Sequence, residues 1–164
     1  MKMTFEDVHR GYVEVDLTDE TCFICDIDGT VADLTHRRHW LLDKPKNWKA
    51  FEQNMIEDEP IEWVINTVLY LQKQGLSMIM CSGRGEQNRK VTENWLEKHG
   101  LHLVKLYMRA KGDYRADDII KSELLDQIIE DGWNPKLTFD DRDRVVRMWR
   151  DRGLTCVQVA EGNF

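Results

Sequence analysis

The sequence predicts an α/β fold in which five parallel strands form a doubly wound sheet with helices on both faces. The first observation is a set of short, nearly continuous apolar runs, which are typical of strands covered on both faces. The second is that segments with apolar residues at helical spacing lie between these runs, and most end just before a glycine. Strands that alternate with helices of this length indicate a parallel sheet with crossover helices.

The apolar runs give the strands and the periodic segments give the helices between them. The expected strands cover residues 22–26, 76–82, 103–108, 136–140 and 154–160. The expected helices cover residues 60–74, 86–99, 117–131 and 142–152. The first of these helices opens with a proline and stops at Gly75, and its apolar residues recur at Ile61, Val64 and Val68, as in a helix with one buried face.

Two segments break this alternation. Residues 33–59 form a basic insertion with two tryptophans before the first expected helix, and we expect a small cap-like element there. Residues 1–20 form a polar lead-in, in which residues 11–17 (GYVEVDL) could add one short edge strand. With 164 residues, the chain is expected to be a single domain, residues 1–164, that is long enough to bury a full core.

The composition is that of a soluble globular protein, with 41% apolar and 32% charged residues. We find no apolar run near the roughly 18 residues of a membrane span and no signal-peptide pattern, so we expect no membrane contact and a cytoplasmic setting. The cysteines lie in or beside apolar strand runs, where a reduced thiol is a small core residue. They are Cys22, Cys25, Cys81 and Cys156.

The charge of the chain is unevenly distributed. A net charge of −7 argues against a general nucleic-acid binder. Residues 33–49, however, carry five Lys or Arg against two Asp, and residues 105–115 carry four against one. Two local basic stretches on an acidic chain indicate an anionic ligand at one place rather than a basic coat.

Unusual polar residues follow the expected strands at their carboxyl ends, where ligands bind in such sheets. Carboxylates after two strands favour Mg²⁺, a hard cation that prefers oxygen ligands. The serine, lysine and arginine among them favour a phosphate. In addition, the i, i+4 spacing of Asp117 and Lys121 predicts an ion pair on one helix face. The residues that follow strands are Asp26, Asp28, Gly29 and Thr30, then Ser82, Gly83 and Arg84, then Asp140, Asp141 and Arg142.

Each of these features also has an ordinary structural explanation. Acidic residues at a helix start complement the helix dipole, Ser-Gly is common in turns, and a surface ion pair contributes little. Their shared position at one sheet edge favours a site instead. A calcium-binding EF-hand is excluded, because Val31 stands where that loop requires glycine. A P-loop is excluded because the sequence has no GxxxxGK[ST] motif.

Four motifs in order resemble those of the haloacid dehalogenase superfamily of phosphohydrolases. They are DIDGT (26–30), CSGR (81–84), a helix with Lys121, and FDD (139–141). Residues 115–125 and 136–164 are further similar to the 3′-phosphatase domains of T-even-phage polynucleotide kinase/phosphatases. The resemblance implies the strand order 3-2-1-4-5. It also implies a stand-alone, phage-encoded phosphatase domain in the host cytoplasm, for which a separate kinase or ligase is a possible partner.

The resemblance also implies roles for residues of the site. Asp26 would be the nucleophile that forms an aspartyl-phosphate, and Asp28 the general acid and then base. Ser82, the amides after it and Lys121 would hold the phosphoryl group, and Asp117 would orient Lys121. The implied Mg²⁺ ligands are Asp26, Asp28 through its backbone carbonyl, Asp140 and Asp141. The implied substrate-binding and supporting residues are Arg37, Ser82, Gly83, Arg84, Lys121, Thr30 and, more weakly, Arg115.

Three other functions remain open at this stage. A small-molecule phosphatase such as a 5′-nucleotidase would share the mechanism. A receiver-type phosphoacceptor module uses a similar sheet, but its acceptor aspartate ends the third strand, whereas here the acids follow the first. A non-catalytic binding protein is disfavoured because every expected catalytic side chain is present. Trp40 and Trp48 could stack on bases of a phosphorylated nucleic-acid end or nucleotide, but we favour a place in the core of the insertion.

Overall fold

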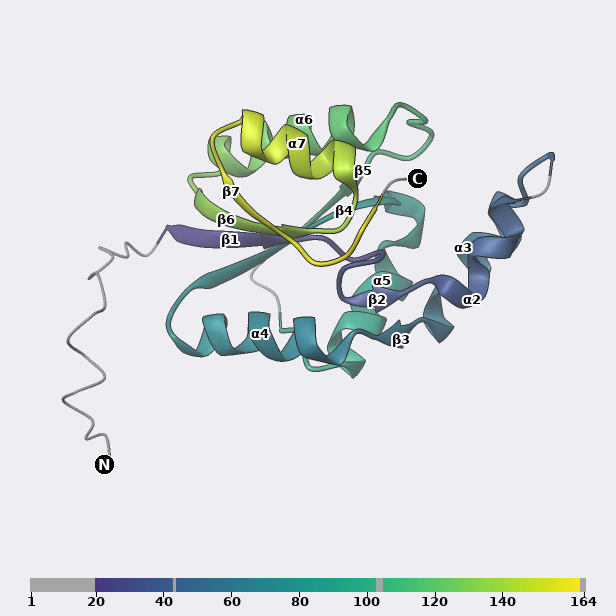
Figure 1. Cartoon of the computed structure of the whole chain (residues 1–164), viewed down its shortest axis with the longest axis horizontal. Helices are drawn as coiled ribbons and strands as arrows, with labels where there is room; N and C mark the ends of the chain where they lie inside the picture. Colours follow the sequence, from purple (N-terminus) through teal and green to yellow (C-terminus); the bar gives the residue numbers. More distant parts are fainter. Residues whose placement is uncertain (1–19, 43, 103–104, 163–164) are drawn as a thin grey trace.

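The structure is a computed structural model that describes residues 20–42, 44–102 and 105–162 (Figure 1). The edge strand expected at residues 11–17 lies outside these described residues. None of the described helices is both long enough and apolar enough to cross a membrane.

A parallel five-stranded sheet forms the centre of the molecule. Its strands lie in the order β5-β4-β1-β6-β7, which confirms the predicted order 3-2-1-4-5. A second, two-stranded antiparallel sheet pairs β2 with β3. The strands are β1 (Thr21–Cys25), β2 (Ala32–Asp33), β3 (Glu59–Pro60), β4 (Ser77–Gly85), β5 (Lys105–Arg109), β6 (Asn134–Asp140) and β7 (Thr155–Gln158).

Helices cover both faces of the sheet, with α6 and α7 on one side and α4 and α5 on the other (Figure 1). Successive side chains of β1 alternate between these faces, since Cys22 and Ile24 pack with α6 and α7 while Phe23 and Cys25 pack with α4 and α5. A strand buried on both faces must be apolar throughout, as the sequence indicated. The helices are α4 (Glu62–Lys73), α5 (Arg89–Lys98), α6 (Asp117–Glu130) and α7 (Asp143–Asp151).

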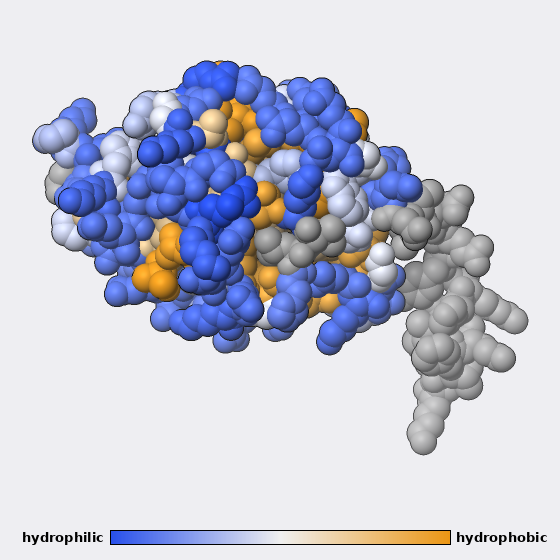
Figure 2. Space-filling model, turned by 180° about the vertical axis from the view of Figure 1, so that it is seen from behind, coloured by the Kyte–Doolittle hydropathy of each residue, from blue (hydrophilic) through white to orange (hydrophobic). Residues whose placement is uncertain are grey.

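Element ends differ from the predicted ones by a few residues. The last strand ends at Gln158 rather than residue 160, because only four residues pair with β6. The helix expected from residue 86 starts with a 3₁₀ turn, η3 (Glu86–Asn88), before α5. Figure 2 shows one face of the molecule, where hydrophilic residues cover most of the surface and hydrophobic residues emerge in separate patches.

The insertion projects from the body between β2 and β3 (Figure 1). We call the projecting residues 35–42 and 44–53 the arm. The prediction that its tryptophans form a buried core is wrong for Trp48, whose exposed fraction is 54%. Trp40 is partly buried against His39, with ring centroids 4.5 Å apart. The elements of the insertion are α2 (Thr35–Arg38), η1 (His39–Leu41), α3 (Trp48–Gln53) and, after the arm, η2 (Met55–Glu57).

All four cysteines are free and buried, as the sequence predicted. Burial raises the pKa of the thiols of Cys22 and Cys81 to about 12, so very little thiolate exists at neutral pH. We therefore expect the native protein to react with a thiol reagent at least ~100-fold more slowly than the urea-unfolded protein. Absorbance of the released thiolate after addition of a disulfide reagent measures this. A single fast-reacting thiol in the native protein would contradict the burial of that cysteine.

Candidate active site

Three carboxylates meet at the carboxyl edge of the sheet. Asp26 follows β1, Asp140 ends β6 and Asp141 comes next, and β1 and β6 are parallel neighbours. Each offers a carboxylate oxygen that lies within 4.8 Å of the other two. All three residues are buried, with exposed fractions of 5% or less. The parallel register therefore brings together residues more than 100 positions apart in the sequence.

Lys121 places its ammonium group between two of these acids. Its Nζ donates to Asp26 Oδ1 and to Asp140 Oδ2, each at 2.7 Å. The predicted ion pair between Asp117 and Lys121 is wrong, since among the described residues Asp117 instead pairs with Arg109 and Arg142. Lys121 is buried, so its side chain satisfies its charge on the acids of the sheet edge rather than on its own helix surface.

The acids carry more charge than Lys121 can balance. Burial raises the pKa of Asp26 well above its ordinary value; Lys121 opposes this, and the charges of Asp140 and Asp141 add to it. Burial and the neighbouring Asp140 raise the pKa of Asp141 to about 6. Burial alone would lower the pKa of Lys121, but Asp140 and Asp26 outweigh it and hold that pKa well above its ordinary value. A divalent cation with oxygen ligands fits this excess of buried carboxylate.

The turn after Asp26 is shaped to bring its neighbours close. Gly29 has φ of +85°, and a Cβ at this position would collide with the carboxylate of Asp141. Thr30 donates through Oγ1 to Asp26 Oδ2 at 3.2 Å. The predicted Gly29-Thr30 pair thus allows the β1 turn to pack against Asp141 and supplies a hydrogen bond to Asp26.

Asp28, two residues after Asp26, lies between two arginines. Arg84 Nη2 lies 2.6 Å and Arg37 Nη2 2.7 Å from Asp28 Oδ1. Burial alone would raise the pKa of Asp28, but the charges of Arg84 and Arg37 outweigh it and lower that pKa to about 2. Both arginines are buried and bound to carboxylates, so their predicted contact with substrate phosphates stays a prediction.

Asp58 anchors the same two arginines and was missed by the sequence reasoning. Its fully buried carboxylate accepts from Arg37 Nε and Nη2 at 2.6 Å and from Arg84 Nη2 at 2.9 Å. His36 Nε2 lies 2.9 Å from Asp58 Oδ1, and Trp95 Nε1 donates to the Asp58 carbonyl at 2.8 Å. Asp58 lies in a segment with neither helical nor strand periodicity, so nothing in the sequence indicated that it binds the two arginines.

Ser82 and Gly83 lie near the end of β4, where its pairing register with β5 shifts between Ser82 and Gly85. The buried Ser82 hydroxyl accepts from the Arg84 amide at 3.2 Å. A Cβ on Gly83 would lie 2.8 Å from Asp117 Oδ1, so glycine permits this close approach. Arg109, at the end of β5, donates through Nε to the Gly83 carbonyl at 2.8 Å and also pairs with Asp117. The position of Arg109 at the end of a strand is the sequence feature that could have marked it as a candidate site residue.

Arg115 lies in the exposed loop before α6. Its guanidinium binds Asp113 at 2.7 Å and Glu123 at 2.6 Å. Its backbone carbonyl accepts from Arg109 Nη1 at 2.7 Å. A role of Arg115 in substrate binding stays a prediction, and the structure gives it a supporting contact to Arg109.

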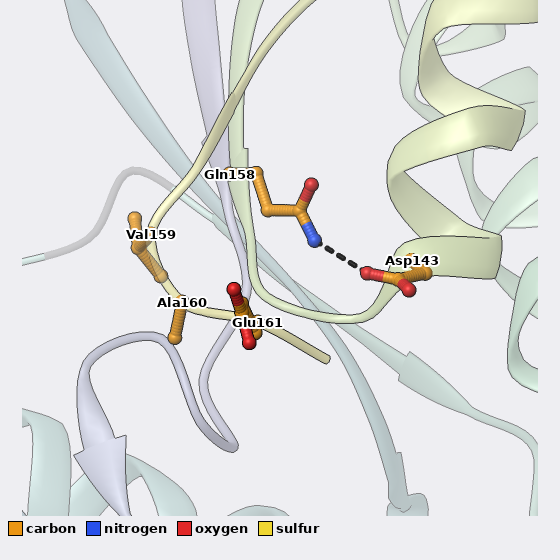
Figure 3. Close-up of a pocket in the computed structure, with 5 residues that line it drawn as sticks. All are labelled: Asp143, Gln158, Val159, Ala160 and Glu161. Atoms are coloured by element: carbon orange, nitrogen blue, oxygen red, sulfur yellow. Dashed lines mark hydrogen bonds between the residues drawn. The ribbon is translucent and has the colours of Figure 1, made fainter. Parts of the chain in front are cut away.

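The C-terminal segment lies beside the turn between β6 and α7, and Figure 3 shows the hydrogen bond from Gln158 to Asp143. Gln158 Nε2 donates to the Asp141 carbonyl at 3.0 Å and to Asp143 Oδ1 at 2.7 Å. The Asp143 amide donates to the Gly162 carbonyl at 3.1 Å. A hollow of about 570 Å³, lined by Asp143 and residues 158–161, lies beside this turn. Sequence reasoning missed Gln158 because an exposed glutamine near a strand end has no distinctive spacing.

Comparison with known proteins identifies the family of this chain. The model of the polynucleotide kinase PNKP phosphatase domain matches residues 20–164. A protein of Autographa californica nuclear polyhedrosis virus that carries the name bifunctional polynucleotide kinase/RNA ligase is 34% identical over 148 residues. That match covers 89% of this chain and 20% of the viral protein.

Solved structures share the fold. A chain of the Pnkp1/Rnl/Hen1 RNA repair complex has a TM-score of 0.78 and 33% identity, over 94% of this chain and 47% of that chain. Class C acid phosphatase from Bacillus anthracis with tungstate bound has a TM-score of 0.66 over 90% of this chain and 69% of that chain. Its 14% identity shows the fold alone. The chain therefore spans about half of the repair-complex chain and a fifth of the viral relative.

The fold and the acid-lysine cluster, together with these matches, define a phosphatase of the haloacid dehalogenase superfamily. Within that superfamily, the chain belongs to the family of polynucleotide kinase PNKP phosphatase domains, because that family's model matches residues 20–164. Both steps confirm the resemblance and the enzyme class predicted from the four motifs.

Proposed function

We propose that the chain removes a 3′-phosphate from a nucleic-acid end or a nucleotide through a covalent aspartyl-phosphate on Asp26. The observation that carries this proposal is the buried cluster of Asp26, Asp140, Asp141 and Lys121 in a PNKP-type phosphatase domain. The names of two relatives, a polynucleotide kinase/RNA ligase and an RNA repair complex, support nucleic acid as substrate and a kinase or ligase as partner.

In the first step, an Asp26 oxygen attacks phosphorus and the bond between phosphorus and the ester oxygen breaks. Lys121, 2.7 Å from Asp26, offsets the charge that develops on the transferring group. The leaving alkoxide takes a proton from Asp28. In the second step, water gives a proton to Asp28 and attacks the aspartyl-phosphate, which releases inorganic phosphate and restores Asp26.

The arginines around Asp28 connect substrate binding with its protonation. Arg84 and Arg37 keep Asp28 ionised when its carboxylate is their partner. A substrate phosphate that competes for these guanidiniums weakens their ion pairs with the Asp28 carboxylate. Burial then raises the pKa of Asp28. The proton that the leaving group needs is thus taken up by Asp28 when the substrate binds.

Mg²⁺ fits the acidic cluster, because three buried carboxylates with one ammonium group leave an excess of negative charge and offer hard oxygen ligands. Asp26, Asp140 and Asp141 would hold the ion, with Asp28 contributing through its backbone carbonyl. The ion supplies neutralisation of the charge on the phosphate and on the acids.

The test is phosphate release from 3′- and 5′-phosphorylated oligonucleotides and mononucleotides, with Mg²⁺ and with EDTA. We expect loss of the 3′-phosphate only, and a decrease of roughly 100-fold or more in EDTA. Equal or faster release from 5′-mononucleotides would overturn the substrate assignment and keep the mechanism. Turnover that is unchanged in EDTA would overturn the metal assignment.

A further inference from the structure

The base of the arm contacts the candidate active site. Arg37, in α2 of the arm, pairs with the carboxylates of Asp28 and Asp58. Its guanidinium carbon Cζ also lies 4.2 Å from the ring centroid of Phe51 in α3. At the end of the arm's second helix, Glu52 accepts from Gln87, just after β4, at 3.4 Å. Asp28 is two residues from Asp26, so the base of the arm contacts the turn that carries both acids, and the arm extends outward from there (Figure 1).

The outer surface of the arm is aromatic and basic. Trp48 is 54% exposed and meets Phe51 edge-on, with ring centroids 6.0 Å apart. Lys46 places its ammonium group 5.5 Å from the centroid of the Trp48 ring, and Lys44 and Lys49, close to Trp48 in the sequence, are exposed. This basic surface belongs to a chain of net charge −7.

The lysines and the exposed tryptophan ring of the arm together favour one class of ligand. A half-exposed tryptophan that contributes little to a core is available for stacking, and the lysines around it attract a polyanion. Bases present their faces to a flat aromatic ring only when the strand is single, because in a duplex they are stacked on one another. Single-stranded nucleic acid satisfies both features at once.

We propose that the arm binds a single strand of nucleic acid next to its terminal phosphate. Trp48 stacks on a base, and Lys44, Lys46 and Lys49 contact backbone phosphates. The position of the terminal phosphate at Asp26 rests on the proposed function. Binding of the strand by the arm does not depend on it. It makes an oligonucleotide a better substrate than a mononucleotide.

Two readouts test the arm, and the second does not depend on turnover. The first is the ratio of kcat/KM for a 3′-phosphorylated oligonucleotide of about 10 nucleotides to that for a 3′-mononucleotide. Trp48→Ala is expected to lower this ratio by roughly 5- to 100-fold. The matched control is Trp63→Ala, because Trp63 is 56% exposed on α4, outside the arm, and it should leave the ratio unchanged.

The second readout is the affinity of the same oligonucleotide, measured by fluorescence anisotropy over a range of salt concentrations. Lys46→Gln should reduce the slope of log affinity against log salt by about 0.7, the value for one phosphate contact on a single strand. Lys73→Gln, at an exposed position at the end of α4, is the control.

The outcomes separate the two proposals. A wild-type protein that releases no 3′-phosphate overturns the proposed function, whereas the anisotropy measurement still decides the arm. An unchanged kcat/KM ratio in Trp48→Ala, an equal loss in Trp63→Ala, or an unchanged salt slope in Lys46→Gln overturns the role of the arm.

Discussion

Asp26→Asn is expected to lower turnover of a 3′-phosphorylated oligonucleotide by at least ~10³-fold, because an amide cannot form the aspartyl-phosphate. The rate of phosphate formation under single-turnover conditions measures this, because that rate is not limited by repeated release of the dephosphorylated product. The matched control is Asp126→Asn, which removes an exposed carboxylate on α6 that pairs with Arg152. Turnover within tenfold of the wild type would contradict the assignment of Asp26 as the nucleophile.

The same substitution is expected to stabilise the metal-free protein. The pKa of Asp26 is raised in the folded state, so the folded protein favours the protonated carboxyl. As the pH rises above the ordinary carboxyl pKa of about 3.9, ionisation of Asp26 opposes folding, and this effect is complete above the raised pKa. Asparagine has no such charge, so the stability gained over the wild type should grow with pH. Urea unfolding in EDTA at about pH 5 and about pH 8 measures it, and a variant less stable than the wild type at the higher pH would contradict the charge account.

The position of the acidic cluster could be predicted from the sequence because it depends on strand direction and on the strand order that the resemblance implied. Runs such as residues 22–26 are apolar on both faces, which requires a covered parallel strand, and parallel strands end at one common edge. Asp26 and Asp140 follow adjacent strands and therefore meet. Gly29 could be singled out because it follows the acids of the first strand, and the structure gives it a left-handed φ that other residues rarely adopt.

Side-chain pairing at the site could not be predicted in this way. The i, i+4 spacing of Asp117 and Lys121 describes neighbours on an exposed helix, but Lys121 is buried and faces the acids of two strands. Asp117 is then available to Arg109 and Arg142, which come from other parts of the chain. Local spacing is a weaker guide wherever long-range burial decides which charges meet.

Asp58 is the clearest case of this kind, and its replacement should have the largest effect on stability. Asp58→Asn leaves Arg37 and Arg84 buried with Asp28 as their remaining carboxylate, so the free energy of unfolding should fall by about 3–5 kcal/mol. Urea unfolding measures the loss. Asp113→Asn, which alters an exposed pair with Arg115, is the control and should leave the unfolding midpoint unchanged.

A second substitution distinguishes this charge effect from a general packing defect. In Asp58→Asn the instability arises from a buried guanidinium without its partner, so removing that guanidinium should restore part of the loss. The double variant Asp58→Asn with Arg37→Met is therefore expected to be destabilised by less than the sum of the two single variants, by about 1–3 kcal/mol. Additive losses would show that Asp58 contributes by packing alone. A coupling of this size would show that the Asp58 carboxylate compensates the burial of the Arg37 guanidinium.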